Sequence, residues 1–74
     1  MPRAKKLLKK LGNRIRDIRK SKGITQTDLA YSINKDQPSI QRLEKGRINP
    51  SFYYLFEVAQ GLDITLEELL KGFE

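Results

Sequence analysis

The sequence contains neither cysteine nor histidine among its 74 residues. The lack of cysteine excludes a disulfide framework and a thiolate metal site. The lack of histidine removes the commonest general base and metal ligand, and no cluster of carboxylates takes its place. We therefore expect no metal, no cofactor and no enzymatic activity.

Long apolar runs are also missing, and no signal peptide is visible. These absences exclude a membrane-spanning helix and favour a cytoplasmic protein without a membrane partner. The length allows one domain, near the lower limit for folding without help. Helix packing must supply the stability, with association of a second subunit as a further source. No segment indicates a small-molecule effector.

What the sequence has in excess is positive charge. Fifteen Lys and Arg face nine Asp and Glu, which gives a formal net charge of +6 and a pI of about 9.8. Such an excess attracts polyanions such as nucleic acid, although a solvated surface that keeps the protein soluble is the alternative. Eleven of the fifteen cations lie in the first 35 positions, whereas the C-terminal end is acidic. This separation indicates a positive face.

Helical periodicity and punctuation divide the chain into five segments, and no sustained strand alternation is present. The pattern predicts an all-α fold. The first helix is expected from Arg3 or Ala4 to Lys20, with an apolar stripe along one side. This stripe consists of Leu7, Leu8, Leu11, Ile15 and Ile18.

Gly12 and Asn13 weaken the middle of this first helix. We therefore divide the chain into a basic stretch at 1–10, either an extension of the helix or a separate arm, and a domain at 11–74. The paired lysines at 5–6 and 9–10 are interpreted as a solvated face, with an arm that follows a nucleic-acid backbone as the alternative.

Capping residues indicate where the second and third helices begin and end. Thr25 and Asp28 form the pattern of a capping box at the second helix, which ends at Asn34, a residue that tolerates positive φ. Asp36 is the expected N-cap of the third helix, and Gly46 ends it.

The last two helices also have recognisable starts. The fourth is expected to begin at 49–51, with Pro50 at the first helical position. The fifth begins at Thr65, with Glu68 three residues on. The expected buried stripe of the fourth helix is Phe52, Leu55, Val58, Ala59 and Leu62.

The segment from 25 to 44, TQTDLAYSINKDQPSIQRLE, thus consists of two short helices joined by a tight turn. Ala30 is small where the two helices would cross, and Ile33, Ile40 and Leu43 supply the apolar contacts. Two helices too short to be stable alone, locked by such contacts, are typical of a helix-turn-helix.

From Leu11 to Gly72 the sequence resembles the Cro/C1-type helix-turn-helix domain, the XRE family of phage repressors and bacterial regulators. The resemblance rests on several motifs that keep their mutual spacing. These are IRDIRKSKGITQTDLA at 15–30, Ile40, LEKG at 43–46, NPS at 49–51, and AQGLDI with LEELL at 59–70.

The resemblance implies a five-helix, lambda-repressor-like domain that binds double-stranded DNA in a sequence-specific way. It further implies a transcriptional regulator that binds a palindromic operator as a homodimer, through a recognition helix at about 37–44. A protein-interaction module of the antitoxin or adaptor kind, whose basic surface meets an acidic partner, is the alternative function. An enzyme is a distant third.

Individual residues receive roles from the same resemblance. Gln side chains can bind adenine and Arg can bind guanine in the major groove, whereas Pro38 offers only apolar contact. Gln26 is expected to touch a phosphate and to brace Gln37, although Gln37 taken alone is an ordinary first-turn polar residue. The positions implied to contact bases are Gln37, Pro38, Gln41 and Arg42. The positions implied to contact the DNA backbone are Gln26, Lys35, Ser39, Arg47 and Asn49.

Two further groups follow from the resemblance. Arg19 and Glu44 match a pair that bridges the first and third helices, and we expect a structural ion pair. Adjacent aromatics on the fourth helix suggest a contact surface, although Phe56 could instead pack within its own chain. The expected dimer interface is Tyr53, Phe56, Gln60, Leu70 and Phe73.

The sequence departs from the family pattern in a few places. Asn34 replaces the usual turn glycine, and positive φ should still be tolerated there. Gly61 and Asp63 stand where the family often has alanine and glycine, so the end of the fourth helix departs from the family pattern.

Overall fold

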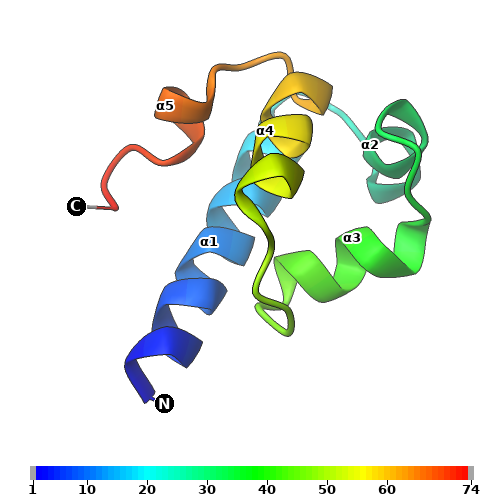
Figure 1. Cartoon of the computed structure of the whole chain (residues 1–74). Helices are drawn as coiled ribbons and strands as arrows, with labels where there is room; N and C mark the ends of the chain where they lie inside the picture. The colour runs from blue at the N-terminus through cyan, green and yellow to red at the C-terminus, as the bar shows by residue number, and fades with distance from the viewer. Residues whose placement is uncertain (1, 74) are drawn as a thin grey trace.

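The computed structural model describes residues 2–73, so Met1 and Glu74 of the predicted segments lie outside the described part. Five helices follow one another: α1 (Pro2–Ser21), α2 (Gln26–Ser32), α3 (Gln37–Glu44), α4 (Phe52–Gly61) and α5 (Leu66–Leu69). The described residues form no strand, which confirms the all-α prediction. The long α1 runs along one side, and α5 lies against it opposite the α2–α3 pair (Figure 1). None of the described helices combines the length and apolarity needed to cross a membrane.

The core draws on every helix. Its fully enclosed side chains include Ile15 from α1, Leu29 from α2, Ile40 from α3 and Leu69 from α5, all 0% exposed. The other buried apolar residues are Leu11, Ala30, Ile33, Leu43, Val58, Ala59 and Leu62. These positions belong to the periodic stripes of the sequence, so apolar periodicity identified most of the core.

Helix α1 continues through Gly12 and Asn13 without interruption, so residues 2–10 extend the helix. Gly12 is buried because α3 ends directly against it: a Cβ there would lie 2.6 Å from the carbonyl carbon of Glu44. The prediction that Leu7 belongs to the buried stripe is wrong, since Leu7 is 51% exposed. It lies in the first turns of α1, which project beyond the core (Figure 1).

The predicted caps at the start of α2 and α3 are present. At α2, the amide of Asp28 donates to Thr25 Oγ1 over 3.0 Å and the amide of Thr25 donates to the Asp28 carboxylate over 3.3 Å. At α3, Asp36 Oδ1 accepts from the amide of Ser39 over 2.9 Å. Asn34 adopts a φ of 57° between the two helices, which makes the tight turn possible.

The start of α4 corrects the sequence prediction. Ser51 is the N-cap, accepting from the amide of Tyr54 over 3.0 Å, so Pro50 precedes the helix and is not its first residue. Phe52 therefore occupies the first helical position, before α4 meets the core, and is 72% exposed where a buried side chain was expected. The helix ends at Gly61, and Asp63, just past the C-cap residue Leu62, adopts a φ of 59°.

Candidate nucleic-acid interface

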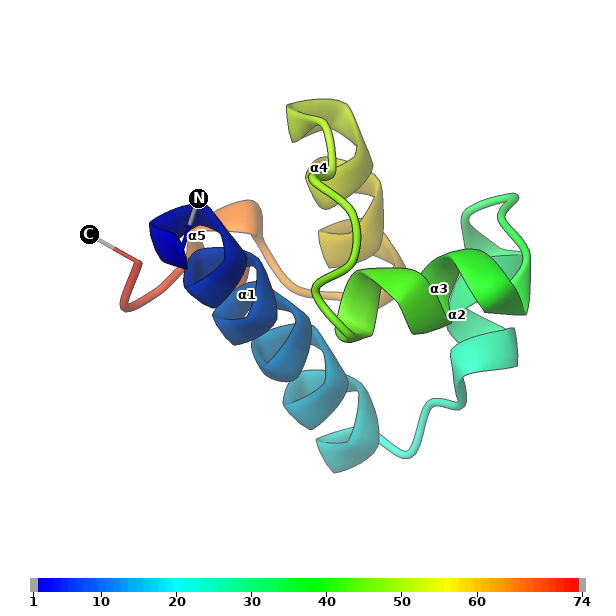
Figure 2. The ribbon, with the colours of Figure 1, turned by 90° about the horizontal axis from the view of Figure 1, so that it is seen from below.

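Helix α3 lies on the surface of the molecule, with α2 behind it in the view from below (Figure 2). Ile40 and Leu43 anchor its inner face, at 0% and 1% exposure. The outer face carries the four positions expected to contact bases. Of these, Pro38, Gln41 and Arg42 are exposed and Gln37 is half-buried.

The side chain of the half-buried Gln37 lies against Gln26 of α2, at the start of a chain of hydrogen bonds. Gln37 Nε2 donates to Gln26 Oε1 over 2.7 Å, and Gln26 Nε2 donates to Glu44 Oε1 over 2.9 Å. Within the described part of the chain, no group bonds the second N–H or the amide oxygen of Gln37. One N–H of the Gln37 amide is thus held by Gln26, and the other N–H and the amide oxygen can bind a ligand as donor and acceptor.

The chain of hydrogen bonds ends in a buried ion pair. Arg19 Nε donates to Glu44 Oε2 over 2.6 Å and Arg19 Nη2 donates to Oε1 over 2.9 Å. Arg19 and Glu44 are only 7% and 5% exposed, and Arg19 Nη1 also donates to the carbonyl of Ile24 over 2.8 Å. This two-bond geometry ties the end of α3 to α1. The link from Gln26 to Glu44, which spans 18 residues, was not anticipated because no local pattern signals it.

A second polar group surrounds the start of α3. Ser39 Oγ donates to Asp36 Oδ1 over 2.6 Å, and Arg42 Nη2 approaches Ser39 Oγ at 3.4 Å. Hydrogen bonds from the Ser39 side chain and backbone, followed by the charge of Arg42, lower the pKa of Asp36 below its usual value. The hydroxyl of Ser39 is therefore already engaged, whereas the exposed Arg42 keeps most of its donors for a partner.

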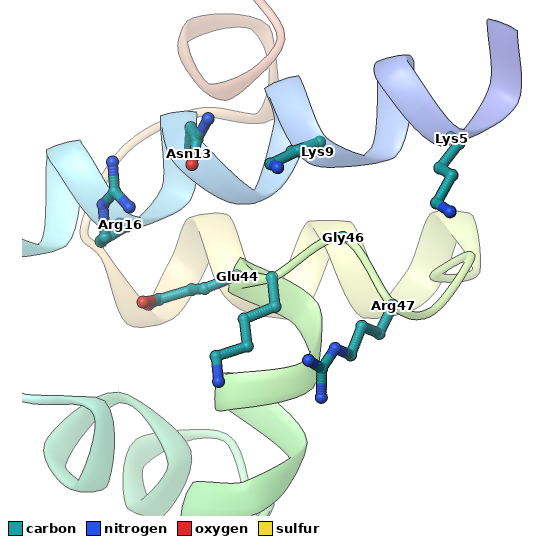
Figure 3. Close-up of a pocket in the computed structure, with 8 residues that line it drawn as sticks. Lys5, Lys9, Asn13, Arg16, Glu44, Gly46 and Arg47 are labelled. Atoms are coloured by element: carbon teal, nitrogen blue, oxygen red, sulfur yellow. The ribbon is translucent and has the colours of Figure 1, made fainter. Parts of the chain in front are cut away.

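The residues expected to contact the DNA backbone lie at both ends of α3. Gln26 and Ser39 are near its start, where Lys35 holds its ammonium 5.1 Å from the centre of the Tyr54 ring. Arg47 and Asn49 are exposed in the loop that follows it. Figure 3 shows the side chain of Arg47 projecting from this loop beside α3.

The structure divides the expected dimer interface into two kinds of residue. Tyr53, Phe56 and Gln60 share one exposed face of α4, with Tyr53 67% and Phe56 42% exposed. Leu70 and Phe73 instead pack partly against the core of their own chain. Phe52 joins the exposed aromatics, and sequence reasoning missed it because the helix was expected to start earlier.

This fold and site define a helix-turn-helix DNA-binding protein. Residues 15–69 match the family model described as helix-turn-helix. The chain belongs to the XRE-type helix-turn-helix family of transcriptional regulators.

Curated relatives agree with this assignment. The HTH-type transcriptional regulator DdrOP3 of Deinococcus deserti is 37% identical over 65 residues, which cover 88% of this chain and 50% of the relative. This chain thus spans half the length of DdrOP3. An uncharacterized HTH-type transcriptional regulator of Archaeoglobus fulgidus is 36% identical over 56 residues, covering 76% of this chain and 80% of the relative.

Solved structures show the same arrangement. The restriction-modification controller protein C.AhdI from Aeromonas hydrophila superimposes with a TM-score of 0.81 at 35% identity, covering 84% of this chain and 90% of that one. The clp gene regulator ClgR from Corynebacterium glutamicum gives a TM-score of 0.83 at 30% identity, covering 86% and 83%.

Proposed function

We propose that this protein regulates transcription by binding a palindromic operator in double-stranded DNA as a homodimer, with α3 in the major groove. The observation that carries the proposal is the braced amide of Gln37. Its free N–H and oxygen match the N7 acceptor and N6 donor of adenine. Because the brace through Gln26 orders the side chain before binding, less conformational entropy is lost on contact with the base.

The rest of the outer face of α3 extends this contact. Arg42 is exposed and presents a fork that fits guanine O6 and N7, and Gln41 lies beside it as a further donor and acceptor. Pro38 can touch a thymine methyl group. Contacts to phosphate set the register without specifying sequence; those proposed are from Gln26, Lys35, Arg47 and Asn49. Ser39 is left out because its backbone N–H and its hydroxyl both donate to Asp36.

The exposed aromatics of α4 support a second copy of the chain as the partner. Adjacent exposed aromatic side chains are a typical contact surface. A two-fold dimer built on Tyr53, Phe56 and Gln60, with Leu70 and Phe73 at its edge, would place two α3 helices in successive major grooves about 34 Å apart. Occupancy of a promoter then represses or activates according to where the operator lies.

Selection of duplexes from a random pool tests the proposal. We expect an inverted repeat whose half-site centres are about 10 base pairs apart. Gln37→Ala should relax specificity at one base pair of each half-site, at a cost of about 1–3 kcal/mol. Arg47→Ala is the contrast, because it should weaken all sequences about equally and lower the salt slope by about 1. A pool without a repeat, or binding insensitive to both Gln37→Ala and Arg42→Ala, would contradict it.

Sedimentation tests the dimer separately. Phe56→Ser replaces an exposed side chain, so the fold should survive while the association weakens. We expect the parent protein to sediment as a dimer and the variant as a monomer with an unchanged circular dichroism spectrum. A parent protein that sediments as a monomer, and whose two copies occupy the two half-sites independently, would refute this interface.

A further inference from the structure

A group of cations lies in a groove between α1 and the end of α3. Figure 3 shows Lys5 pointing from α1 toward the loop that carries Arg47. The two sides are close because Gly46 packs on α1, where a Cβ would lie 2.8 Å from the Cα of Lys9. We call this the basic groove; its cationic residues are Lys5, Lys9, Arg16, Lys45 and Arg47.

Almost nothing among residues 3–73 neutralises the basic groove. Its one acidic residue, Glu44, directs its carboxylate to Arg19 and Gln26. Arg16 approaches Asp17 at 3.4 Å, with the Arg16 side chain 44% exposed and that of Asp17 69% exposed. The other four cations form no ion pair among residues 3–73. The groove therefore presents concentrated positive charge to whatever lies against it.

Helix electrostatics explain only one side of the basic groove. Lys45 and Arg47 follow the C-terminus of α3, where the helix dipole favours cations. Lys5 lies near the N-terminus of α1, where the dipole disfavours cations, and the first turn of that helix contains no acid. A charge placed against local preference points to a functional constraint, which an external anion would supply.

We infer that the basic groove binds DNA phosphates adjacent to those met by the loop after α3. The inference rests on the proposed function. Arg47 lines the basic groove and is also one of the residues proposed to contact DNA phosphates. A duplex that lies against α3 and meets Arg47 therefore brings neighbouring phosphates to the open side of the basic groove. Cations of α1 then strengthen binding to every sequence and add no discrimination between bases.

A matched pair of double variants tests the inference. Lys5→Gln with Lys9→Gln removes two charges from the basic groove. Lys6→Gln with Lys22→Gln removes two charges elsewhere, since neither residue lines the basic groove and Lys22 donates to the carbonyl of Asp63. Glutamine has about the helix propensity of lysine, and melting temperatures verify that both variants fold.

The measurement is the association constant for a duplex of arbitrary sequence and about 30 base pairs, long enough for two half-sites one helical turn apart. Each phosphate contact contributes about 0.9 to the slope of log K against log salt. We expect the groove variant to lower the slope by about 2 for each protomer, with the control variant close to the parent. Phosphate ethylation should identify sites whose interference is lost in the groove variant alone.

Other outcomes overturn the inference. Equal losses in the two double variants would show a general effect of net charge, and an unchanged slope in the groove variant would show that its lysines do not meet phosphate. In either case the proposed function stands if Gln37→Ala still relaxes specificity. Conversely, the salt slope could fall only in the groove variant while the parent protein selects no preferred duplex from the random pool. That result would support phosphate binding in the basic groove and refute the proposed function.

Discussion

Replacing Glu44 with alanine should remove the acceptor on which α1, α2 and α3 converge. Its carboxylate accepts from Arg19 over 2.6 and 2.9 Å and from Gln26 over 2.9 Å. Arg19 is 7% exposed, so in the variant its guanidinium keeps only the carbonyl of Ile24 as a partner. A buried charge without compensation costs about 3–5 kcal/mol, and we expect the free energy of unfolding to fall by that amount.

This loss is large for a domain of 74 residues, whose free energy of unfolding is roughly 4–11 kcal/mol. Urea denaturation followed by circular dichroism measures it as a lower midpoint with an unchanged slope. The double variant Arg19→Met with Glu44→Leu is the control, because it removes both charges and fills the space with apolar atoms. Such replacements are often neutral or stabilising, so most of the stability should return.

The double variant also separates stability from positioning. Gln26 loses its acceptor in both variants, so the side chain that holds Gln37 is no longer anchored, even where the fold is restored. We expect the double variant to bind the selected operator with the relaxed base preference of Gln37→Ala.

Two results would refute this reasoning. A change of less than about 1 kcal/mol in Glu44→Ala would show that the pair behaves like an exposed ion pair. Full base discrimination in the stable double variant would show that the orientation of Gln37 does not depend on Glu44.

Three further substitutions probe other parts of the molecule. Gly12→Ala should lower the melting temperature, although alanine favours helix by about 1 kcal/mol, because its Cβ would lie 2.6 Å from the carbonyl carbon of Glu44. Tyr54→Phe should raise the free energy of unfolding in urea by about 1 kcal/mol, since this hydroxyl is buried without a hydrogen-bond partner in the described structure. Asp36→Asn keeps an N-cap but removes a carboxylate whose pKa is lowered by the hydrogen bonds of Ser39. The lowered pKa makes the ionised form stabilising at neutral pH, and this effect is lost progressively as the pH falls below about 4 and through the folded-state pKa, so urea midpoints should fall less steeply with acid in the variant.

The sequence predicted those features that depend on neighbours in the chain. Thr25 caps α2 through a residue three positions on, and Asn34 adopts positive φ within a four-residue turn. Side-chain chemistry over such distances is limited, so the pattern determines the geometry. The apolar stripes identified the core for the same reason, because helical periodicity fixes which side chains share a face.

Features that depend on where another helix ends could not be predicted. Gly12 weakens a helix in isolation, yet here it allows the end of α3 to approach α1. Pro50 satisfied the rule for a first helical residue, but Ser51 supplies the N-cap and moves the start of α4. The exposure of Phe52 follows from that shift, since the first turn of α4 precedes its contact with the core.

The position of the recognition helix is set at both of its ends. At its C-terminal end, α3 meets α1 at two places on one face, since Gly12 contacts the backbone of Glu44 and Arg19, two turns later, binds its carboxylate. At its N-terminal end, Gln37 is tied through Gln26 to the same carboxylate. A displacement of α3 by Gly12→Ala must therefore strain the ion pair and loosen Gln37 together. Because both substitutions act on the same contact between α1 and α3, their effects on the free energy of unfolding should not be additive. The separate losses from Gly12→Ala and Glu44→Ala should sum to more than the loss measured when both substitutions are combined in one protein.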